Sequence, residues 1–180
     1  MDRFVAIDFE TADHGRDSAC AVGLVRCEKG RIVDRLHRLI RPPRDRFVFT
    51  YIHGITWHRV RTEPSFAELW PEVREFIRGA EFLAAHNAPF DRGVLQACCQ
   101  AADLAPPEHP FLCTVKLARS AWSLYPTNLP AVCRARRISL KHHEALSDAE
   151  ACAQIVLQAM KEGVPLDALP TPRPAYGTLD

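Results

Sequence analysis

The segment FVAIDFETAD, residues 4–13, decides the fold expected of this chain. Its bulky apolar residues at every second position alternate with a set that includes Asp8 and Glu10, and a period of two is typical of a β-strand. Asp8 and Glu10 would then share one face, with Cα atoms roughly 6 to 7 Å apart. Carboxylates held so close in partly dry surroundings repel one another, so they need either water or a cation. Both an edge strand with one solvated face and a metal-binding strand fit this segment alone.

The composition indicates one domain without a strong global charge. The chain has 180 residues, 47% of them apolar, which suffices for one substantial core but not for two domains. Its 23 Lys and Arg balance 22 Asp and Glu, so no overall field attracts nucleic acid or membrane. A polyanion would have to be held locally, although solvated surface arginine is the commoner case. The candidate clusters are Arg41, Arg44 and Arg46, and Arg134, Arg136 and Arg137.

The seven cysteines indicate a reduced protein of the cytoplasm. Most of them lie in apolar runs such as CAVGLVRC, and their odd number fits packed thiols better than a disulfide framework. No CxxC pair occurs in the sequence, so we expect no structural zinc site. The chain starts with a strand pattern and has no run near 18 apolar residues, so we expect neither a signal peptide nor a membrane partner.

The rest of the pattern predicts an α/β fold. Strands at 20–27 and 31–40 would form an antiparallel meander with the first strand, whereas 41–57 has too little periodicity for a helix or strand and is expected to be a loop. Further along, we expect a helix capped by Ser65 and Glu68, a strand at 82–85, a helix through 94–102, a strand near 111–114, a helix from about 115 and a final helix after 143. This order gives a mixed sheet covered by helices.

Two further acids lie where helices are expected to start. Asp91 ends the run HNAPFD, and Asp148 follows Ser147, which we expect to form a capping box with Glu150. The helix dipole favours a carboxylate in the first turn, so each acid also has an ordinary structural explanation. His143 lies five residues before Asp148, on a loop or in the first turn.

The segments DFET, HNAPFD and HHEALSDA, in this order and at these separations, resemble the three motifs of the DEDDh 3′–5′ exonucleases. This family is typified by the proofreading subunit of bacterial DNA polymerase III, and the similarity runs from about Phe4 to Met160. It implies a ribonuclease H-like fold with the first strand central and further strands parallel. By position, the resemblance implies Asp8, Glu10, Asp91 and Asp148 as metal ligands, these four with His143 as catalytic residues, and Thr11, His53 and Asn87 as substrate-binding residues.

Oxygen ligands suit Mg²⁺ or Mn²⁺. Two such ions about 3.5 to 4 Å apart can clamp a phosphodiester, and His143, with an unperturbed pKa near 6.5, would be the general base. His142 is chemically equivalent, and only the motif spacing selects His143. The first motif reads DFETAD rather than the DxETTG common in proofreading subunits, which bears on the nucleotide pocket and leaves the metal ligands intact.

We therefore expect a metal-dependent exonuclease domain at 1–162 that removes nucleoside 5′-monophosphates from single-stranded or frayed 3′ ends of DNA. An RNA-trimming enzyme stays open, because that choice depends on contacts to the 2′-hydroxyl. A binding module without catalysis is less expected, since four acids oppose phosphate binding without metal. The proline-rich segment 163–180 is expected to be a loosely ordered tail, with no long helix to bind a polymerase, which favours a stand-alone enzyme. Oligomeric state is not indicated.

Overall fold

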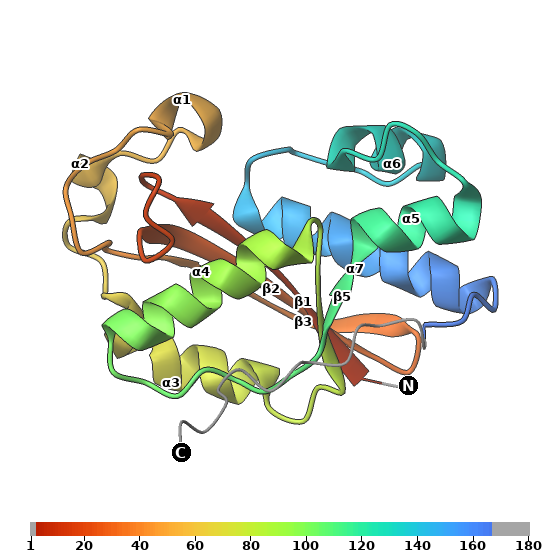
Figure 1. Cartoon of the computed structure of the whole chain (residues 1–180), viewed down its shortest axis with the longest axis horizontal. Helices are drawn as coiled ribbons and strands as arrows, with labels where there is room; N and C mark the ends of the chain where they lie inside the picture. The colour runs from red at the N-terminus through yellow and green to blue at the C-terminus, as the bar shows by residue number, and fades with distance from the viewer. Residues whose placement is uncertain (1–2, 167–180) are drawn as a thin grey trace, which may run out of the picture.

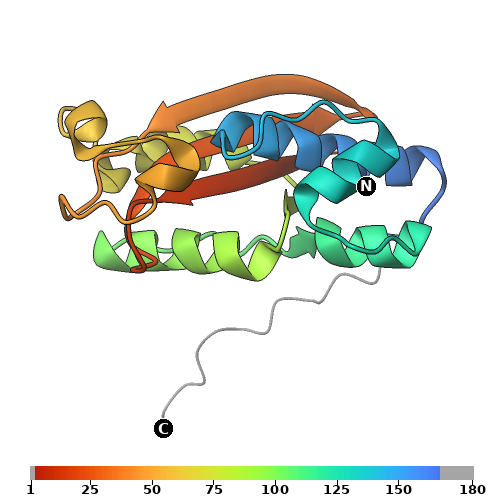
Figure 2. The same ribbon diagram turned by 90° about the horizontal axis from the view of Figure 1, so that it is seen from above.

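A mixed sheet of five strands, in the order β3-β2-β1-β4-β5, forms the centre of the structure, a computed structural model that describes residues 3–166. The first three strands are antiparallel neighbours, and β4 and β5 continue the sheet parallel to β1. The strands are β1 (Arg3–Thr11), β2 (Ala19–Glu28), β3 (Arg31–Leu39), β4 (Phe82–Ala85) and β5 (Phe111–Cys113). The predicted meander and the parallel extension are confirmed, and β3 lies at the edge of the sheet in Figure 2.

Helices cover both faces of this sheet. Figure 1 looks along the sheet, with α3 and α4 on one side, α5, α6 and α7 on the other, and α1 and α2 beyond one end of the strands. The helices are α1 (Thr50–His53), α2 (Trp57–Val60), α3 (Phe66–Ile77), α4 (Ala88–Ala101), α5 (Thr114–Trp122), α6 (Leu129–Arg136) and α7 (Ala145–Lys161). The predicted Ser65–Glu68 capping box is present at the start of α3.

The first strand is central and buried on both faces. Its odd-numbered apolar side chains join the core formed with α3 and α4. Phe4 and Ala6 instead pack in the core formed with α5, α6 and α7. Asp8 and Glu10 continue this second face, since side chains two residues apart in a strand point the same way. A solvated edge strand is therefore the wrong interpretation of FVAIDFETAD, and the two acids lie under α7.

The expectation of a loop over 41–57 was wrong in part, because this segment contains the single-turn helices α1 and α2. Four residues span little more than one helical turn, so no apolar period can show in the sequence. Tertiary contacts fix the segment instead: the amides of Val48 and Phe49 both donate to the carbonyl oxygen of Ala12, at 2.7 and 3.2 Å. Gly54, with φ of 72°, ends α1.

The predicted capping box at Ser147 and Glu150 was also wrong. Helix α7 begins at Ala145, three residues earlier than that box requires, with Glu144 at the N-cap. The Ser147 hydroxyl oxygen accepts a hydrogen bond from the amide of Lys141 at 2.8 Å, so it fixes the preceding loop instead of the helix start. Asp148 nevertheless lies in the first turn, as predicted.

The cysteines are reduced, and the folded domain extends slightly beyond its predicted end. All seven cysteines carry free thiols, and six of them are buried. Within residues 3–166, none of the helices combines the length and the apolar character needed to cross a membrane. Val164 and Leu166 still pack on the core of α5, α6 and α7, so the first residues of the predicted tail belong to the folded domain. The rest of that tail, 167–180, lies outside the described residues.

Candidate active site

Three carboxylates meet at the end of β1. Oxygen atoms of Asp8, Glu10 and Asp148 all lie within 4.8 Å of one another. The pairing of β1 with β2 shifts register between Glu10 and Thr11, and such irregularities commonly redirect side chains beside active sites. The predicted convergence of the first and third acidic segments is thus present in the structure.

A glycine in β2 allows α7 to approach these acids. Gly23 pairs with Asp8 across the sheet, and a Cβ atom at Gly23 would lie 2.2 Å from the carbonyl oxygen of Ala145. The first turn of α7 therefore rests directly on the backbone of β2, which brings Asp148 beside Asp8. Sequence reasoning missed this residue, although a glycine inside a strand pattern is a known signal of close backbone approach.

The fourth acid, Asp91, comes from the first turn of α4 and is only 1% exposed. Its Oδ1 accepts a hydrogen bond from the amide of Phe9 at 3.0 Å, which ties the start of α4 to β1. Its Oδ2 is buried and has no hydrogen-bond partner within residues 3–166. The same is true of Asp148 Oδ1. Buried oxygens without partners are rare in proteins and require a specific explanation.

The acids raise one another's pKa. Burial, followed by the charges of Asp91, Asp148 and Glu10, raises the pKa of Asp8 well above its ordinary value. Burial, with a contribution from Asp148, raises the pKa of Glu10 to about 7. Burial raises the pKa of Asp91 to about 8, although the Phe9 amide lowers it in part. A group of carboxylates that resists ionisation in this way is suited to bind a cation, whose charge keeps the acids ionised.

These residues fit a divalent metal ion. The donor set consists of carboxylate oxygens, two of which are buried and unpartnered within the described residues. Hard oxygen ligands suit Mg²⁺ or Mn²⁺. Asp8, Glu10, Asp91 and Asp148 are therefore the residues that could hold the metal.

The two neighbouring histidines differ in their contacts. The amide of His143 donates to Asp148 Oδ2 at 3.2 Å, and its ring is exposed and stacks on the ring of His142 with 3.7 Å between centroids. Burial and the His142 ring lower the pKa of His143. His142 uses its Nδ1 to contact Asp148 Oδ2 at 2.8 Å. The structure thus separates two residues that the sequence left equivalent: of this pair, His142 engages a ring nitrogen and His143 engages neither within residues 3–166.

The three predicted substrate-binding residues border the same strand end. The Ile55 amide donates to His53 Nδ1 at 3.0 Å, so Nε2 carries the ring hydrogen and donates it to the carbonyl oxygen of Thr11 at 3.1 Å. Burial lowers the pKa of His53, and the charge of His143 lowers it further. Asn87 is exposed at the N-cap of α4 with φ of 69°. Its side chain makes no capping hydrogen bond to that helix.

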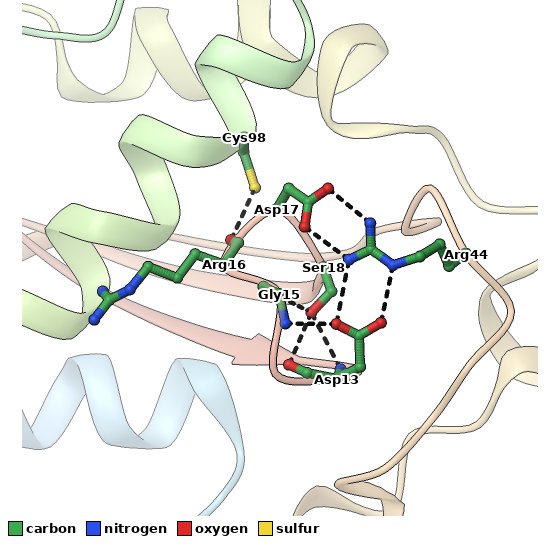
Figure 3. A network of polar contacts seen from close by, with 7 residues as sticks. All are labelled: Asp13, Gly15, Arg16, Asp17, Ser18, Arg44 and Cys98. Atoms are coloured by element: carbon green, nitrogen blue, oxygen red, sulfur yellow. Dashed lines mark hydrogen bonds and ion pairs between the residues drawn. The ribbon is translucent and has the colours of Figure 1, made fainter.

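The loop after β1 is held by an arginine that sequence reasoning offered as a phosphate ligand. Figure 3 shows the Arg44 guanidinium between Asp13 and Asp17. It contacts Asp13 at 3.0 and 3.2 Å and Asp17 at 2.7 and 2.8 Å. Asp13 is 7% exposed and also accepts a hydrogen bond from the Gly15 amide at 2.7 Å. Hydrogen bonds from Arg44 lower the pKa of both aspartates.

The same loop is attached to α4. Arg16 extends across that helix (Figure 3) and donates to the carbonyl oxygens of Pro89 and Phe90, at 3.2 Å each. Gly93 makes room for it, since a Cβ there would lie 2.0 Å from Arg16 Nη1. The loop therefore joins the end of β1 to the first turn of α4. Of the second arginine cluster, Arg136 likewise serves structure, because it pairs with Glu162 and lies over the Trp122 ring.

The sequence is similar to an exonuclease family model and to DNA polymerase III PolC-type proteins. Residues 5–156 match the model of the exonuclease family RNase_T. The DNA polymerase III PolC-type protein of Thermotoga maritima is 33% identical over 86% of this chain, and that of Bacillus subtilis is 28% identical over 88%. The chain spans only 12% and 11% of the lengths of these two relatives.

Solved structures agree with the fold. Exonuclease X, in complex with 5′-overhanging duplex DNA, is 26% identical with a TM-score of 0.75, and the match covers 92% of this chain and 96% of that one. The nuclease domain of 3′hExo, a DEDDh family member bound to rAMP, has a TM-score of 0.79 at 19% identity, over 92% of this chain and 94% of that one. The predicted ribonuclease H-like fold is confirmed.

Proposed function

Since the chain belongs to the exonuclease family RNase_T and is of the DEDDh 3′–5′ type, we propose that it removes nucleotides from the 3′ end of DNA. Two Mg²⁺ or Mn²⁺ ions would take part, and the residues that would hold them are Asp8, Glu10, Asp91 and Asp148. Members of this family use divalent metal ions. The observation that carries the proposal is that oxygens of Asp8, Glu10 and Asp148 lie within 4.8 Å of one another. Asp91 is close enough to raise the pKa of Asp8, and Asp91 Oδ2 and Asp148 Oδ1 are buried without partners among residues 3–166.

When bound, the ions would supply positive charge that keeps the carboxylates ionised and offsets the charge developing on the phosphodiester. His143 would accept a proton from the attacking water. Its lowered pKa keeps the imidazole neutral near pH 7, and its ring nitrogens are unengaged within the described residues. The water oxygen bonds to phosphorus as the bond from phosphorus to the 3′ oxygen breaks. That oxygen takes up a proton, and the products are a nucleoside 5′-monophosphate and a shortened strand.

The terminal nucleotide would lie beside Thr11, His53 and Asn87. His53 holds the Thr11 carbonyl through Nε2, so it positions the strand end as well as bordering the pocket. Asn87 has its side chain free of capping contacts to α4, which leaves the amide available for a polar group of the substrate. Asp8→Asn and His53→Ala should therefore differ: the first should remove turnover, and the second should mainly raise KM.

DNA is favoured as substrate because exonuclease X is described with duplex DNA and the PolC-type relatives are DNA polymerases. RNA trimming is the alternative, and a binding module without catalysis would leave the proton acceptor and the four acids without a chemical purpose.

The test is a time course with 5′-labelled single-stranded DNA, RNA and frayed duplex of one sequence, in Mg²⁺, Mn²⁺ or EDTA. We expect a ladder that shortens from the 3′ end of DNA only with metal. Internal cuts at early times, or full activity in EDTA, would refute the proposal, and faster loss of RNA would favour the alternative.

The PolC-type relatives support a second candidate role, in which the domain proofreads beside a polymerase. The two roles predict different substrate preferences. A stand-alone enzyme should degrade free single strands rapidly by itself. A proofreading domain should act mainly on mismatched primer ends and gain rate when a replicative polymerase is added.

A further inference from the structure

The carboxylate of Asp148 is held asymmetrically. Its Oδ2 accepts two hydrogen bonds, from His142 Nδ1 at 2.8 Å and from the amide of His143 at 3.2 Å. Its Oδ1 accepts none within residues 3–166, although the residue is only 5% exposed. Both donors thus act on one oxygen, and the other stays buried and unsatisfied. This division is what a metal ligand needs, because one oxygen is fixed and the other is left for a cation.

The local backbone and the stacked rings explain why His142 can make this contact. His143 adopts φ of 65°, in the left-handed region, which turns the chain just before α7. The two imidazole rings stack with 24° between their planes, so His143 limits the orientations that the His142 ring can take. An ionised carboxylate can only accept hydrogen bonds, so His142 carries its hydrogen on Nδ1. His142 has no equivalent contact to Asp8 or Glu10.

We propose that His142 is a positioning residue: through its Nδ1–H on Asp148 Oδ2, it keeps Asp148 Oδ1 directed at the divalent cation. This rests on the metal site of the proposed function and adds a residue that the motif spacing had set aside. Hydrogen-bond partners of metal ligands fix ligand orientation, and their loss typically weakens metal affinity about 10- to 100-fold. The adjacent histidines would then have different roles: His142 would orient the metal ligand Asp148, and His143 would accept a proton from the attacking water.

Two amide substitutions test the hydrogen bond itself. The amide nitrogen of Asn can occupy the place of imidazole Nδ1, whereas that of Gln reaches the place of Nε2. His142→Asn should therefore keep the contact to Asp148, and His142→Gln should lose it, with little difference in polarity or size. His142→Phe is a third variant that keeps a ring stacked on His143 and has no donor.

The measurement is Mn²⁺ binding to the full chain without nucleic acid, by calorimetry, with melting temperatures recorded in EDTA. We expect His142→Asn to stay within about threefold of the wild type and both His142→Gln and His142→Phe to bind about 10- to 100-fold more weakly. A tenfold loss equals about 1.4 kcal/mol less stabilisation by saturating metal. His109→Phe is the matched control, because His109 precedes β5 at the opposite end of the parallel strands.

Equal affinity in all variants would overturn the proposal. So would equal losses in His142→Asn and His142→Gln, since ring packing and not the donor would then matter. If one variant fails to fold in EDTA, the other donor-free variant decides the question. Failure of the metal site itself looks different: wild-type protein would bind no Mn²⁺, or Asp8→Asn would bind it normally.

Discussion

Replacing Asp8 by Asn tests whether the acids at the end of β1 form a metal site. Asp8 is surrounded by the charges of Asp91, Asp148 and Glu10, which together with burial raise its pKa. Asn has nearly the same shape but no charge. In the metal-free protein the substitution should therefore remove repulsion and stabilise the fold, although it deletes a ligand.

The size of the gain follows from the geometry. The acid oxygens lie within 4.8 Å of one another, and two unit charges at that separation repel by about 3.5 kcal/mol at an effective dielectric constant of about 20. The acids are not fully ionised near neutral pH, because burial raises the pKa of Glu10 to about 7. We therefore expect a net stabilisation of about 2 kcal/mol at pH 8 in EDTA, which for a domain of this size corresponds to a rise in Tm of about 4 to 8 °C.

Calorimetry in EDTA and in Mg²⁺ provides the assay, with nuclease activity measured on the same samples. Mg²⁺ should raise the Tm of the wild type and leave that of Asp8→Asn nearly unchanged, and turnover should fall by about 10³ or more in the variant. Asp45→Asn is the matched control, since Asp45 is exposed in the loop before α1. An unchanged or lower Tm in EDTA, together with a normal response to Mg²⁺, would refute the reasoning.

His143→Ala should lower the single-turnover rate by about 10² or more with Mn²⁺ affinity retained in calorimetry; a parallel loss of affinity would argue against a role as base. In EDTA, burial raises the pKa of Glu10 from 4.5 to about 7. The folded state thus binds the proton more tightly than the unfolded chain, so the free energy of unfolding, measured in urea with EDTA, should fall as pH rises from 4.5 to about 7. Mg²⁺ should weaken this pH dependence. A free energy of unfolding that rises with pH in EDTA would contradict the prediction. Gly23→Ala should lower Tm and turnover together, since its Cβ would lie 2.2 Å from a carbonyl of α7; a normal melt would show that α7 can shift. Arg44→Met should destabilise the fold by about 2 kcal/mol at pH 7. Arg44 lowers the pKa of its two aspartate partners, so this stability exists above pH 3.8 and is lost as pH falls further; equal destabilisation in urea melts at pH 3 and pH 7 would argue against the charge contact.

The parts of the fold that were predictable from the sequence depend on local signals. The alternation in FVAIDFETAD gave a strand with two acids on one face, and the helical period after Ser65 gave α3 with its cap. Single-turn helices such as α1 have no such period. The Ser147 capping box failed because the Lys141 amide bonds the same hydroxyl, a competition that only the folded loop reveals.

The finer construction of the site depends on contacts between distant residues. Asp91 is oriented by the amide of Phe9, 82 residues away in the chain. Arg44 binds Asp13, 31 residues earlier in the chain. This contact engages its guanidinium, which the sequence had grouped with Arg41 and Arg46 as a candidate site for a polyanion. His142 could not be distinguished from His143 by type or spacing, and its bond to Asp148 means that His142→Ala is not a neutral control for the base.

The arginines sharpen the argument for a metal. Two acids just beyond β1, Asp13 and Asp17, share the guanidinium of Arg44, and their pKa values fall. Asp8 and Glu10, only a few residues earlier, have no arginine or lysine paired with them within residues 3–166, and their pKa values rise. The chain has 23 Lys and Arg residues, so basic side chains are plentiful, but none is placed beside Asp8 and Glu10 within residues 3–166. An arginine beside Asp8, Glu10 and Asp148 would offset only one of their charges and would fill space that a phosphodiester needs. A divalent cation taken from solution supplies two positive charges while leaving open positions for substrate oxygens, which is why this group of acids is better explained as a metal-dependent catalytic site than as a structural network.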